Sequence, residues 1–280
     1  MIAEDPIRRR ELVACNTAPD SENRMHGDEA RRYGFSSGLV PGVEVLAYLA
    51  HDGVTTWGPG WLGAGRLSGR LIAPVYDGET VEVIATAATA AGDVVEASVR
   101  GTGDPVGVVR ATAELSRLTD GDRVELLARA DPSTFDVAVP PDPADRPAAA
   151  AHLLEPGTAL ATQWATFRAD RASSYLDEIS ETHPAFRTEG LAHPGWLLRF
   201  ANWALSTTVR LGPWIHVSSD ARFLDVVHDG GHLEVRARVI DRFERKGHQF
   251  VDLTALYLVD DRPVALVDHR AIWEPRLAAQ

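Results

Sequence analysis

The amino-acid sequence predicts an α+β protein made of two copies of one unit, in which a long buried helix is wrapped by an antiparallel sheet. Three observations support this: the chain repeats weakly on itself, two strongly apolar helices each begin at a Pro-Gly pair, and runs of alternating residues follow each helix. Strands follow strands instead of alternating with helices, which favours α+β over α/β.

The repeat appears when the chain is laid on itself at a shift of 152 positions. Gly38-Leu39 then falls on Gly190-Leu191, and both pairs precede a Pro-Gly pair. The turn at 75–78 falls on the turn at 227–230, and the apolar strands after the two turns coincide. Because the order and spacing agree, we interpret the chain as two copies of one unit.

Each copy contains one helix that we expect to be buried. Pro41-Gly42 begins the apolar run VEVLAYLAH, and Pro194-Gly195 begins WLLRFANWALSTTV. Proline is tolerated in the first turn of a helix, where its missing N–H would have no intrahelical partner. Apolar residues on most faces indicate a helix surrounded by protein.

Strand patterns surround both helices. Asp-Gly, Gly-Asp, Lys-Gly and Asp-Asp-Arg-Pro separate the runs as hairpin turns. One strand is expected before each helix, over 10–16 and 158–167, and four after each, over 65–73, 80–90, 93–101 and 106–115 and over 214–224, 232–240, 248–259 and 263–273. We therefore expect an N-terminal unit over 1–117, an Asp-, Pro- and Ala-rich linker over 118–157 with a short helix near 122–130, and a C-terminal unit over 158–280.

Composition restricts the class of protein. With 45% apolar residues and no apolar run of membrane-spanning length, the 280-residue chain is expected to be soluble. The N-terminal residues lack the apolar core of a signal peptide, so we expect a cytoplasmic location. The net charge of −12 argues against a nucleic-acid partner. Cys15 is the only cysteine, which excludes an internal disulfide and a multi-thiolate metal site.

The segment DSENRMHGDEARRYGFSSGLVPG, residues 20–42, places Asn23 and His26 three residues apart just before the first apolar helix. It resembles the Asp-x-Asn-Pro-x-His signature of the MaoC-like hydratase/dehydratase group, and the repeat resembles the double hotdog fold of that group. Ser21 stands at the aspartate position, Arg24 at the proline position, and Pro41 where a histidine is common. The match is therefore partial, and it departs from the signature at the catalytic acid.

The resemblance implies a lyase that adds water reversibly to a 2-enoyl thioester, presented on coenzyme A or an acyl carrier, without a metal or other cofactor. His26 would carry the proton, and Asn23 would hold the water or the imidazole. Glu22 or, second, Asp20 would replace the aspartate. The free backbone amides around Pro41-Gly42 would polarise the thioester oxygen, and Val40, Pro41 and Gly42 would contact the substrate.

A purely structural interpretation of this segment stays open. Asp20 or Ser21 could cap a surface helix over 22–33, with His26 an ordinary partly buried histidine. The second copy has Tyr175 and Glu178 where the first has Asn23 and His26, so the polar pair is not repeated. We therefore expect one working site, with the other copy shaping the tunnel.

Three further histidines are candidates for substrate contact. His193 precedes the second helix and either caps it or faces the ligand. His216 is ambiguous from sequence. His248 follows the charged turn Glu-Arg-Lys-Gly, which is either a solvated loop or a cationic lip for the phosphates of coenzyme A. The His-Asp-Gly-Gly-His run at 228–232 fits a hairpin better than a metal site.

The sequence leaves rival functions open. The first prediction is an enoyl-thioester hydratase or dehydratase; the same fold would also support a thioesterase with a single carboxylate. A third possibility is an acyl-binding module without catalysis, which would fit the lost aspartate. A fourth is dehydration or ring closure on a biosynthetic intermediate. Exposed outer strands could pair between chains, which would give a homodimer.

Overall fold

The computed structural model describes residues 7–88, 93–103 and 107–278. Three expectations fall partly outside these ranges: the N-terminal end, residues 1–6, on which the absence of a leader was judged, residues 89–90 of one expected strand, and residue 106 of another. Within the described ranges, no helix is both long enough and apolar enough to cross a membrane.

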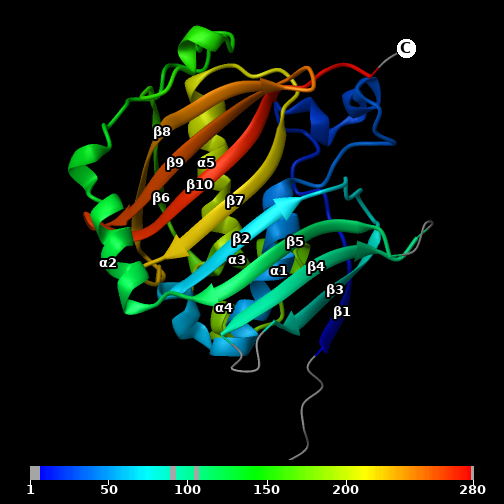
Figure 1. The fold of residues 1–280 in the computed structure, drawn as a ribbon, viewed down its shortest axis with the longest axis vertical. Coiled ribbons are helices and arrows are strands. Elements are labelled where there is room, and N and C mark those ends of the chain that lie inside the picture. Colours follow the sequence, from blue (N-terminus) through cyan, green and yellow to red (C-terminus); the bar gives the residue numbers. More distant parts are fainter. Residues whose placement is uncertain (1–6, 89–92, 104–106, 279–280) are drawn as a thin grey trace, which may run out of the picture.

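The framework is one antiparallel sheet, in the order β1-β3-β4-β5-β2-β7-β10-β9-β8-β6 (Figure 1). The strands from the first half are β1 (Ile7–Val13), β2 (Gly65–Leu71), β3 (Thr80–Ala87), β4 (Val94–Gly101) and β5 (Val109–Arg117). Those from the second half are β6 (Ala159–Thr166), β7 (Ile215–Phe223), β8 (His232–Arg245), β9 (His248–Val259) and β10 (Arg262–Glu274). Each expected strand segment therefore contains a strand.

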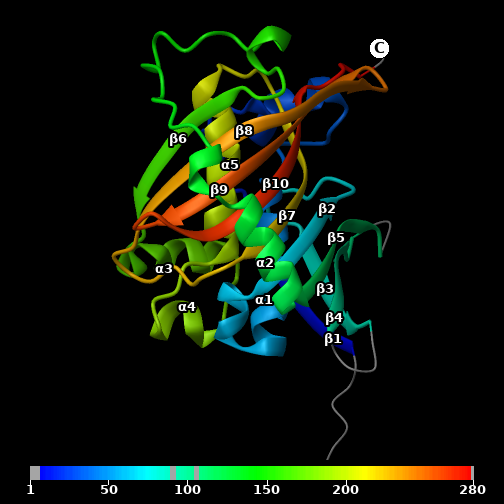
Figure 2. The ribbon, with the colours of Figure 1, turned by 60° about the vertical axis from the view of Figure 1, so that its left-hand side comes forward.

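Two long helices, α1 (Gly42–Trp57) and α5 (Pro194–Thr208), pack side by side on one face of the sheet (Figure 1). The shorter α2 (Asp120–Arg129) lies on the opposite face (Figure 2). There Leu126 and Ala130 pack against Leu256 and Leu266 of the sheet. The linker therefore covers part of the outer face.

The remaining helical segments are short. They are α3 (Ala169–Glu178), α4 (Pro184–Thr188) and the 3-10 turns η1 (Arg24–His26), η2 (Asp28–Tyr33), η3 (Pro59–Gly63), η4 (Pro132–Thr134) and η5 (Ala151–Leu153). The surface helix considered over 22–33 is not continuous: Gly27, with φ −125° and ψ −165°, is extended and separates η1 from η2. The sequence analysis did not anticipate α3 and α4, which lie where the first copy has 3-10 turns and irregular chain.

The backbone repeats the pattern seen in the sequence. The segment before α1 forms an isolated bridge between Leu39 and Tyr76, and the segment before α5 forms one between Leu191 and His228, at the same positions after a shift of 152. The amide of the next residue also makes equivalent hydrogen bonds of 2.9 Å in both copies. The two copies therefore share the same strand-to-helix connection.

The copies meet where β2 pairs with β7. Ser68 lies opposite Asp220, its own counterpart at the shift of 152, so an approximate two-fold axis passes between them. Across this line Arg66 donates to both carboxylate oxygens of Asp220, at 2.9 and 2.8 Å. The sheet consequently continues from one copy into the other.

A buried carboxylate links the two central helices. Glu181 accepts a hydrogen bond from His51 of α1 at 2.7 Å and one from His193, the N-cap of α5, at 3.2 Å. Burial by itself would raise the pKa of Glu181, but the hydrogen bonds from the two imidazoles reverse this and lower it below its usual value. The anionic form is therefore stabilised by folding.

The close approach of α5 to α1 at Gly195 makes the first prediction. An added Cβ would lie 2.5 Å from the Cβ of Ala47 and would also collide with the Tyr175 hydroxyl. Gly195→Ala should therefore destabilise the fold by about 1–3 kcal/mol through overpacking. Gly212→Ala, where a Cβ would meet nothing within 4 Å, is the matched control. Denaturant unfolding of both variants measures the difference, and equal midpoints would contradict the packing described.

The second prediction concerns Glu181. Because its folded pKa is lowered, its stabilising contribution is present above the ordinary value of 4.5 and is lost as the pH falls below it. Glu181→Gln should cost roughly 2–4 kcal/mol at neutral pH, since breaking a buried pair leaves its partners uncompensated. Unfolding curves at several pH values should show the gap to the wild type narrowing in acid. If the difference in unfolding free energy between the two proteins did not depend on pH, the negative charge of Glu181 would not be what stabilises the fold.

Candidate functional site

Two cavities meet beside Asn23 and His26 on the helical face of the sheet. The first, the apolar chamber, has a volume of about 250 Å³ and is lined by apolar side chains that include Met25, Phe35, Leu39, Val45, Leu71 and Ile272. The second, the polar chamber, has about 440 Å³ and includes Thr17, Ser21, Glu44, Arg146, Arg199 and Ser206. Both are lined by Asn23, His26, Pro41, Asn202 and Trp214. The sequence-predicted pair therefore lies where the two chambers join.

The hydrogen bonds of His26 define its proton positions. Its Nδ1 lies 2.7 Å from the carbonyl oxygen of Leu39. Since a carbonyl only accepts, Nδ1 carries the proton, and the lone pair is on Nε2. Burial lowers the pKa of His26 below its usual value, although the Leu39 carbonyl opposes the shift. The imidazole is therefore neutral at neutral pH and presents a basic nitrogen.

Asn23 holds that imidazole in place. Its Oδ1 accepts from the backbone amides of Met25 and Trp214, both at 3.2 Å, and its Nδ2 donates to the Trp214 carbonyl at 3.0 Å. Nδ2 also lies 3.2 Å from Nε2 of His26, which can only accept here. Of the two roles expected for Asn23, the geometry favours orienting the imidazole. It also connects η1 to the chain that leads into β7.

The first turn of α1 borders the apolar chamber. Val40, Pro41 and Gly42, which the sequence predicts as substrate-binding residues, all line it. The first amides of a helix have no intrahelical acceptor, and they lie at the positive end of the helix dipole. A side chain at Gly42 would collide with Leu71 and would come within 2.8 Å of Nδ1 of His216. Glycine therefore lets the start of α1 pack closely against Leu71 and His216.

The sequence analysis missed Glu44, in the first turn of α1. Its side chain is 1% exposed, and it lines the polar chamber together with His26. Arg199 and Thr17 donate to its Oε1, at 2.9 Å from both Arg199 Nε and Thr17 Oγ1, while its Oε2 is buried with no partner among the described residues. The available signal was a carboxylate in the first turn of a largely apolar helix, because a buried acid requires a partner.

The two carboxylates proposed from sequence lie farther out. Glu22 sits at the rim of the polar chamber, where its side chain is 72% exposed and Arg146 donates to both its oxygens at 2.9 and 3.0 Å. Asp20 is exposed and lines neither chamber. Ser21, at the aspartate position of the signature, does line the polar chamber.

The three other candidate histidines lie in different parts of the structure. His216 lines the apolar chamber. His193 does not: its Nδ1 accepts from the amide of Gly195 at 3.1 Å, which makes it the cap of α5. His248 is half-buried at the start of β9, accepts from the amide of Arg276 at 3.1 Å, and lines neither chamber. Only His216 among the three lies with His26.

The equivalent place in the second copy is occupied by Tyr175. Its hydroxyl oxygen lies against Gly195 in the first turn of α5, and burial raises the pKa of Tyr175 well above its usual value. The guanidinium of Arg199 stacks 4.2 Å from the ring centre. Gly195 is buried and lines neither chamber, whereas Gly42 is partly exposed and lines the apolar chamber.

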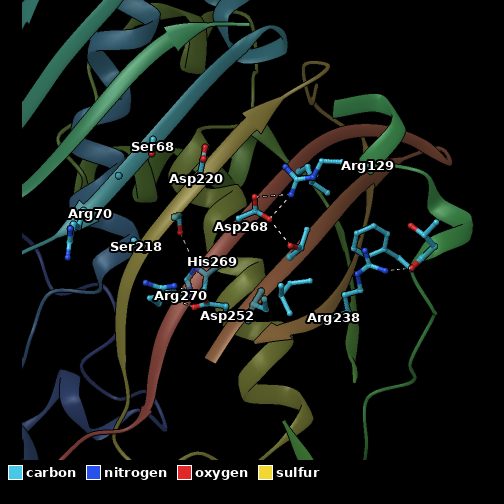
Figure 3. A pocket seen from close by; sticks show the side chains of 18 of the residues that line it. Ser68, Arg70, Arg129, Ser218, Asp220, Arg238, Asp252, Asp268, His269 and Arg270 are labelled. Carbon is cyan, nitrogen blue, oxygen red and sulfur yellow. Dashed lines mark hydrogen bonds and ion pairs between the residues drawn. The ribbon is translucent and has the colours of Figure 1, made fainter. Parts of the chain in front are cut away.

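A larger hollow of about 790 Å³ lies on the outer face, between the sheet and the segment around α2 (Figure 3). Its charges compensate each other: Arg270 donates to Asp252 at 2.6 Å, and Arg129 lies 3.0 Å from Asp268. Among the described residues, no group of three His, Cys, Asp or Glu side chains could hold a metal ion there or elsewhere. Neither His26 nor Gly42 lines this hollow.

No protein-family model matches the sequence, and no curated protein matches it. Solved structures do match over nearly the whole chain. A conserved hypothetical protein from Mycobacterium tuberculosis, described as having a double hotdog fold, matches with 14% identity, a TM-score of 0.59 and coverage of 95% of each chain.

Two further matches carry functional names. A protein from Chloroflexus aurantiacus, described as a MaoC domain dehydratase, matches with 13% identity, a TM-score of 0.54 and 95% coverage of both chains. A protein from Novosphingobium aromaticivorans, described as a thioesterase, matches with 13% identity, a TM-score of 0.55 and 97% coverage of both chains. At these identities the likeness establishes the fold alone: the chain has the hotdog fold that these proteins share.

Proposed function

We propose that this chain is a double hotdog protein, with α1 and α5 as its central helices, that adds water to a 2-enoyl thioester or removes it from the 3-hydroxyacyl product. The observation that carries the proposal is the junction of the two chambers. A neutral imidazole with a basic Nε2 meets the free amides of a helix N-terminus there. Both MaoC-like dehydratases and thioesterases share the fold, so the thioester substrate is common to them.

In the proposed complex the thioester oxygen lies at the amide of Gly42. The acyl chain extends into the apolar chamber, and the arm that carries the thioester passes through the polar chamber. Addition of water places negative charge on the thioester oxygen, because the intermediate is enolate-like. Amides that are already oriented stabilise that charge without reorganisation.

His26 carries the proton in the proposed mechanism. Water replaces the Asn23 amide as the hydrogen-bond partner of Nε2, and Nε2 then takes a proton from that water as the water oxygen bonds to C3 of the enoyl group. The electron pair of the double bond moves toward the thioester oxygen, and the imidazolium then returns the proton to C2. The Leu39 carbonyl, which accepts from Nδ1, stabilises the imidazolium in between.

Glu44 replaces the missing aspartate in this proposal, in preference to Glu22 and Asp20. Its carboxylate lines the polar chamber and accepts a hydrogen from the attacking water, while Arg199 and Thr17 fix its Oε1. Glu22 is exposed at the rim of the chamber, and Arg146 donates to both its oxygens. A buried carboxylate is better shielded from bulk water than an exposed one, and it therefore orients a water more strongly.

The direct test is loss of the enoyl-thioester absorbance with crotonyl-CoA. His26→Ala should lower kcat by a factor of about 10² or more, because it removes the proton carrier. His152→Ala, at an exposed histidine outside both chambers, is the matched control and should keep full activity. If the His26→Ala variant hydrated crotonyl-CoA at the wild-type rate, this mechanism would be excluded.

The pH profile provides a separate prediction. His26 must be unprotonated to act as a base, and burial lowers its pKa from the ordinary 6.5. The value of kcat/KM for crotonyl-CoA should therefore be flat through neutral pH and fall in acid, with a midpoint below 6.5. A midpoint above 6.5 would disagree with the burial of His26.

Thioester hydrolysis is the second candidate, because Glu44 is a buried carboxylate on the central helix beside the same junction. Hydrolysis releases a free thiol, whereas hydration does not, so a thiol-reactive dye separates the two reactions on the same substrate. Saturable binding of crotonyl-CoA without either signal would instead indicate an acyl-binding protein.

A further inference from the structure

Two buried histidines and a serine form a hydrogen-bonded chain behind the apolar chamber. Nε2 of His216 lies 2.9 Å from the hydroxyl oxygen of Ser219, which lies 2.9 Å from Nδ1 of His269. The two imidazoles stack, with ring centres 4.3 Å apart and an interplanar angle of 19°. The mechanism proposed above uses none of the three.

A β-bulge creates this chain. His216 pairs with Ala271 and Ser218 with Arg270, so Val217 has no partner on β10 and the register shifts there. In a regular strand, residues three apart face opposite sides. The extra residue turns His216 to the same side as Ser219, which faces the helices. The bulge therefore brings the imidazole and the hydroxyl together.

One ring nitrogen at each end of this hydrogen-bonded chain has no partner. Nδ1 of His216 and Nε2 of His269 are both buried and have no hydrogen-bond partner among the described residues. His216 is 5% exposed, and its Nδ1 is directed at Gly42, 2.8 Å from the position of an added Cβ. This free nitrogen therefore lies beside the first amide of α1, in the wall of the apolar chamber.

Both imidazoles are neutral. Burial lowers the pKa of His216 to about 4, although the nearby Ser218 carbonyl acts to raise it. Burial is also the main cause that lowers the pKa of His269, and a repulsive interaction with His216 adds to it. Each ring thus has one N–H, and the serine has one O–H. If the Ser219 hydroxyl donates to one of the two imidazoles, the hydrogen-bonded chain has two possible directions.

The two directions leave different groups unpaired. In one, His269 Nδ1 donates to Ser219, Ser219 donates to His216 Nε2, and the free proton is on His216 Nδ1, next to the chamber. In the other, every bond reverses, and His269 is left with a buried Nε2–H that meets no acceptor. Each direction therefore leaves one buried N–H without a protein partner. Only the N–H of the first direction lies in the wall of the apolar chamber, where a ligand oxygen could accept it, so a bound ligand would favour the first direction.

We propose that His216 is a second hydrogen-bond donor to the thioester oxygen, beside the amide of Gly42, and that Ser219 and His269 hold its proton on Nδ1. This rests on the proposed function for the identity of the ligand. His216 is then a catalytic residue that contacts substrate, and Ser219 and His269 are positioning residues. The N–H of the neutral imidazole and the amide of Gly42 would each donate one hydrogen bond to an oxygen that becomes negative.

The direction of the chain is measured first, by ¹⁵N NMR of the histidine side chains in the intact protein. The proposal requires a protonated Nδ1 and an unprotonated Nε2 on His216. The reverse pattern overturns it, whether or not the protein has enzymatic activity. This measurement therefore separates a failure of the inference from a failure of the proposed function.

The contact is measured next, by adding crotonyl-CoA to the same sample. A shift of the His216 Nδ1–H resonance supports the contact, and a resonance that stays unchanged while the ligand binds overturns it. A shift without turnover would leave the inference standing and refute the hydratase.

Variants then test the effect on rate. His216→Phe removes the donor and should lower kcat by about 10²–10³, with a smaller change in KM, because the oxygen is charged mainly in the transition state. Ser219→Ala breaks the chain and should lower kcat by about tenfold, while Ser219→Thr, which keeps the hydroxyl, should restore it.

The control for Ser219 is its neighbour. Successive side chains of a strand point to opposite faces, and Ser218 is partly exposed beside the outer hollow (Figure 3), whereas Ser219 is buried. Ser218→Ala therefore makes the same chemical change on the other face of β7. It should leave kcat and the His216 resonances unchanged. Equal losses from Ser218→Ala and Ser219→Ala would show a general effect on β7 and would overturn the assigned role of the serine.

Discussion

The pairing of β2 with β7 is the contact on which the rest of the structure depends. It joins the two copies into one sheet at a point where Ser68 faces its own counterpart, Asp220. A continuous sheet places α1 and α5 side by side on one face, because each helix covers its own half. The approximate two-fold relation then brings the N-terminus of α1 against β7, a strand of the other copy. The candidate site exists only because of that contact.

The site is consequently composite and asymmetric. The first copy supplies His26 and the amide of Gly42, and the second supplies the Trp214 backbone and the ring of His216. At the place that the approximate two-fold axis relates to this site, Tyr175 lies against the start of α5. The start of α1 therefore borders a chamber that a ligand could enter, while the start of α5 is covered by Tyr175, which packs in the core.

The groups around the junction carry little net charge before a ligand enters. Burial lowers the pKa values of His26 and His216, so both imidazoles are neutral, and Arg199 compensates the carboxylate of Glu44. In the proposed reaction, charge would develop on the ligand oxygen beside the helix end and, with the opposite sign, on His26. Pre-orientation of donors in a site shielded from water is how enzymes stabilise a developing oxyanion.

The sequence alone determined the local elements: the strands, the two apolar helices after Pro-Gly, and the repeat that the Leu39 and Leu191 bridges reproduce. These follow from periodicity and turn chemistry, which act over a few residues. Only the tertiary structure decided which polar residues meet, namely that Glu44 reaches the chamber of His26 and that Glu22 stays at its rim. The bulge at Val217 also escapes sequence reasoning, because strand register is set by partners that lie far away in the chain.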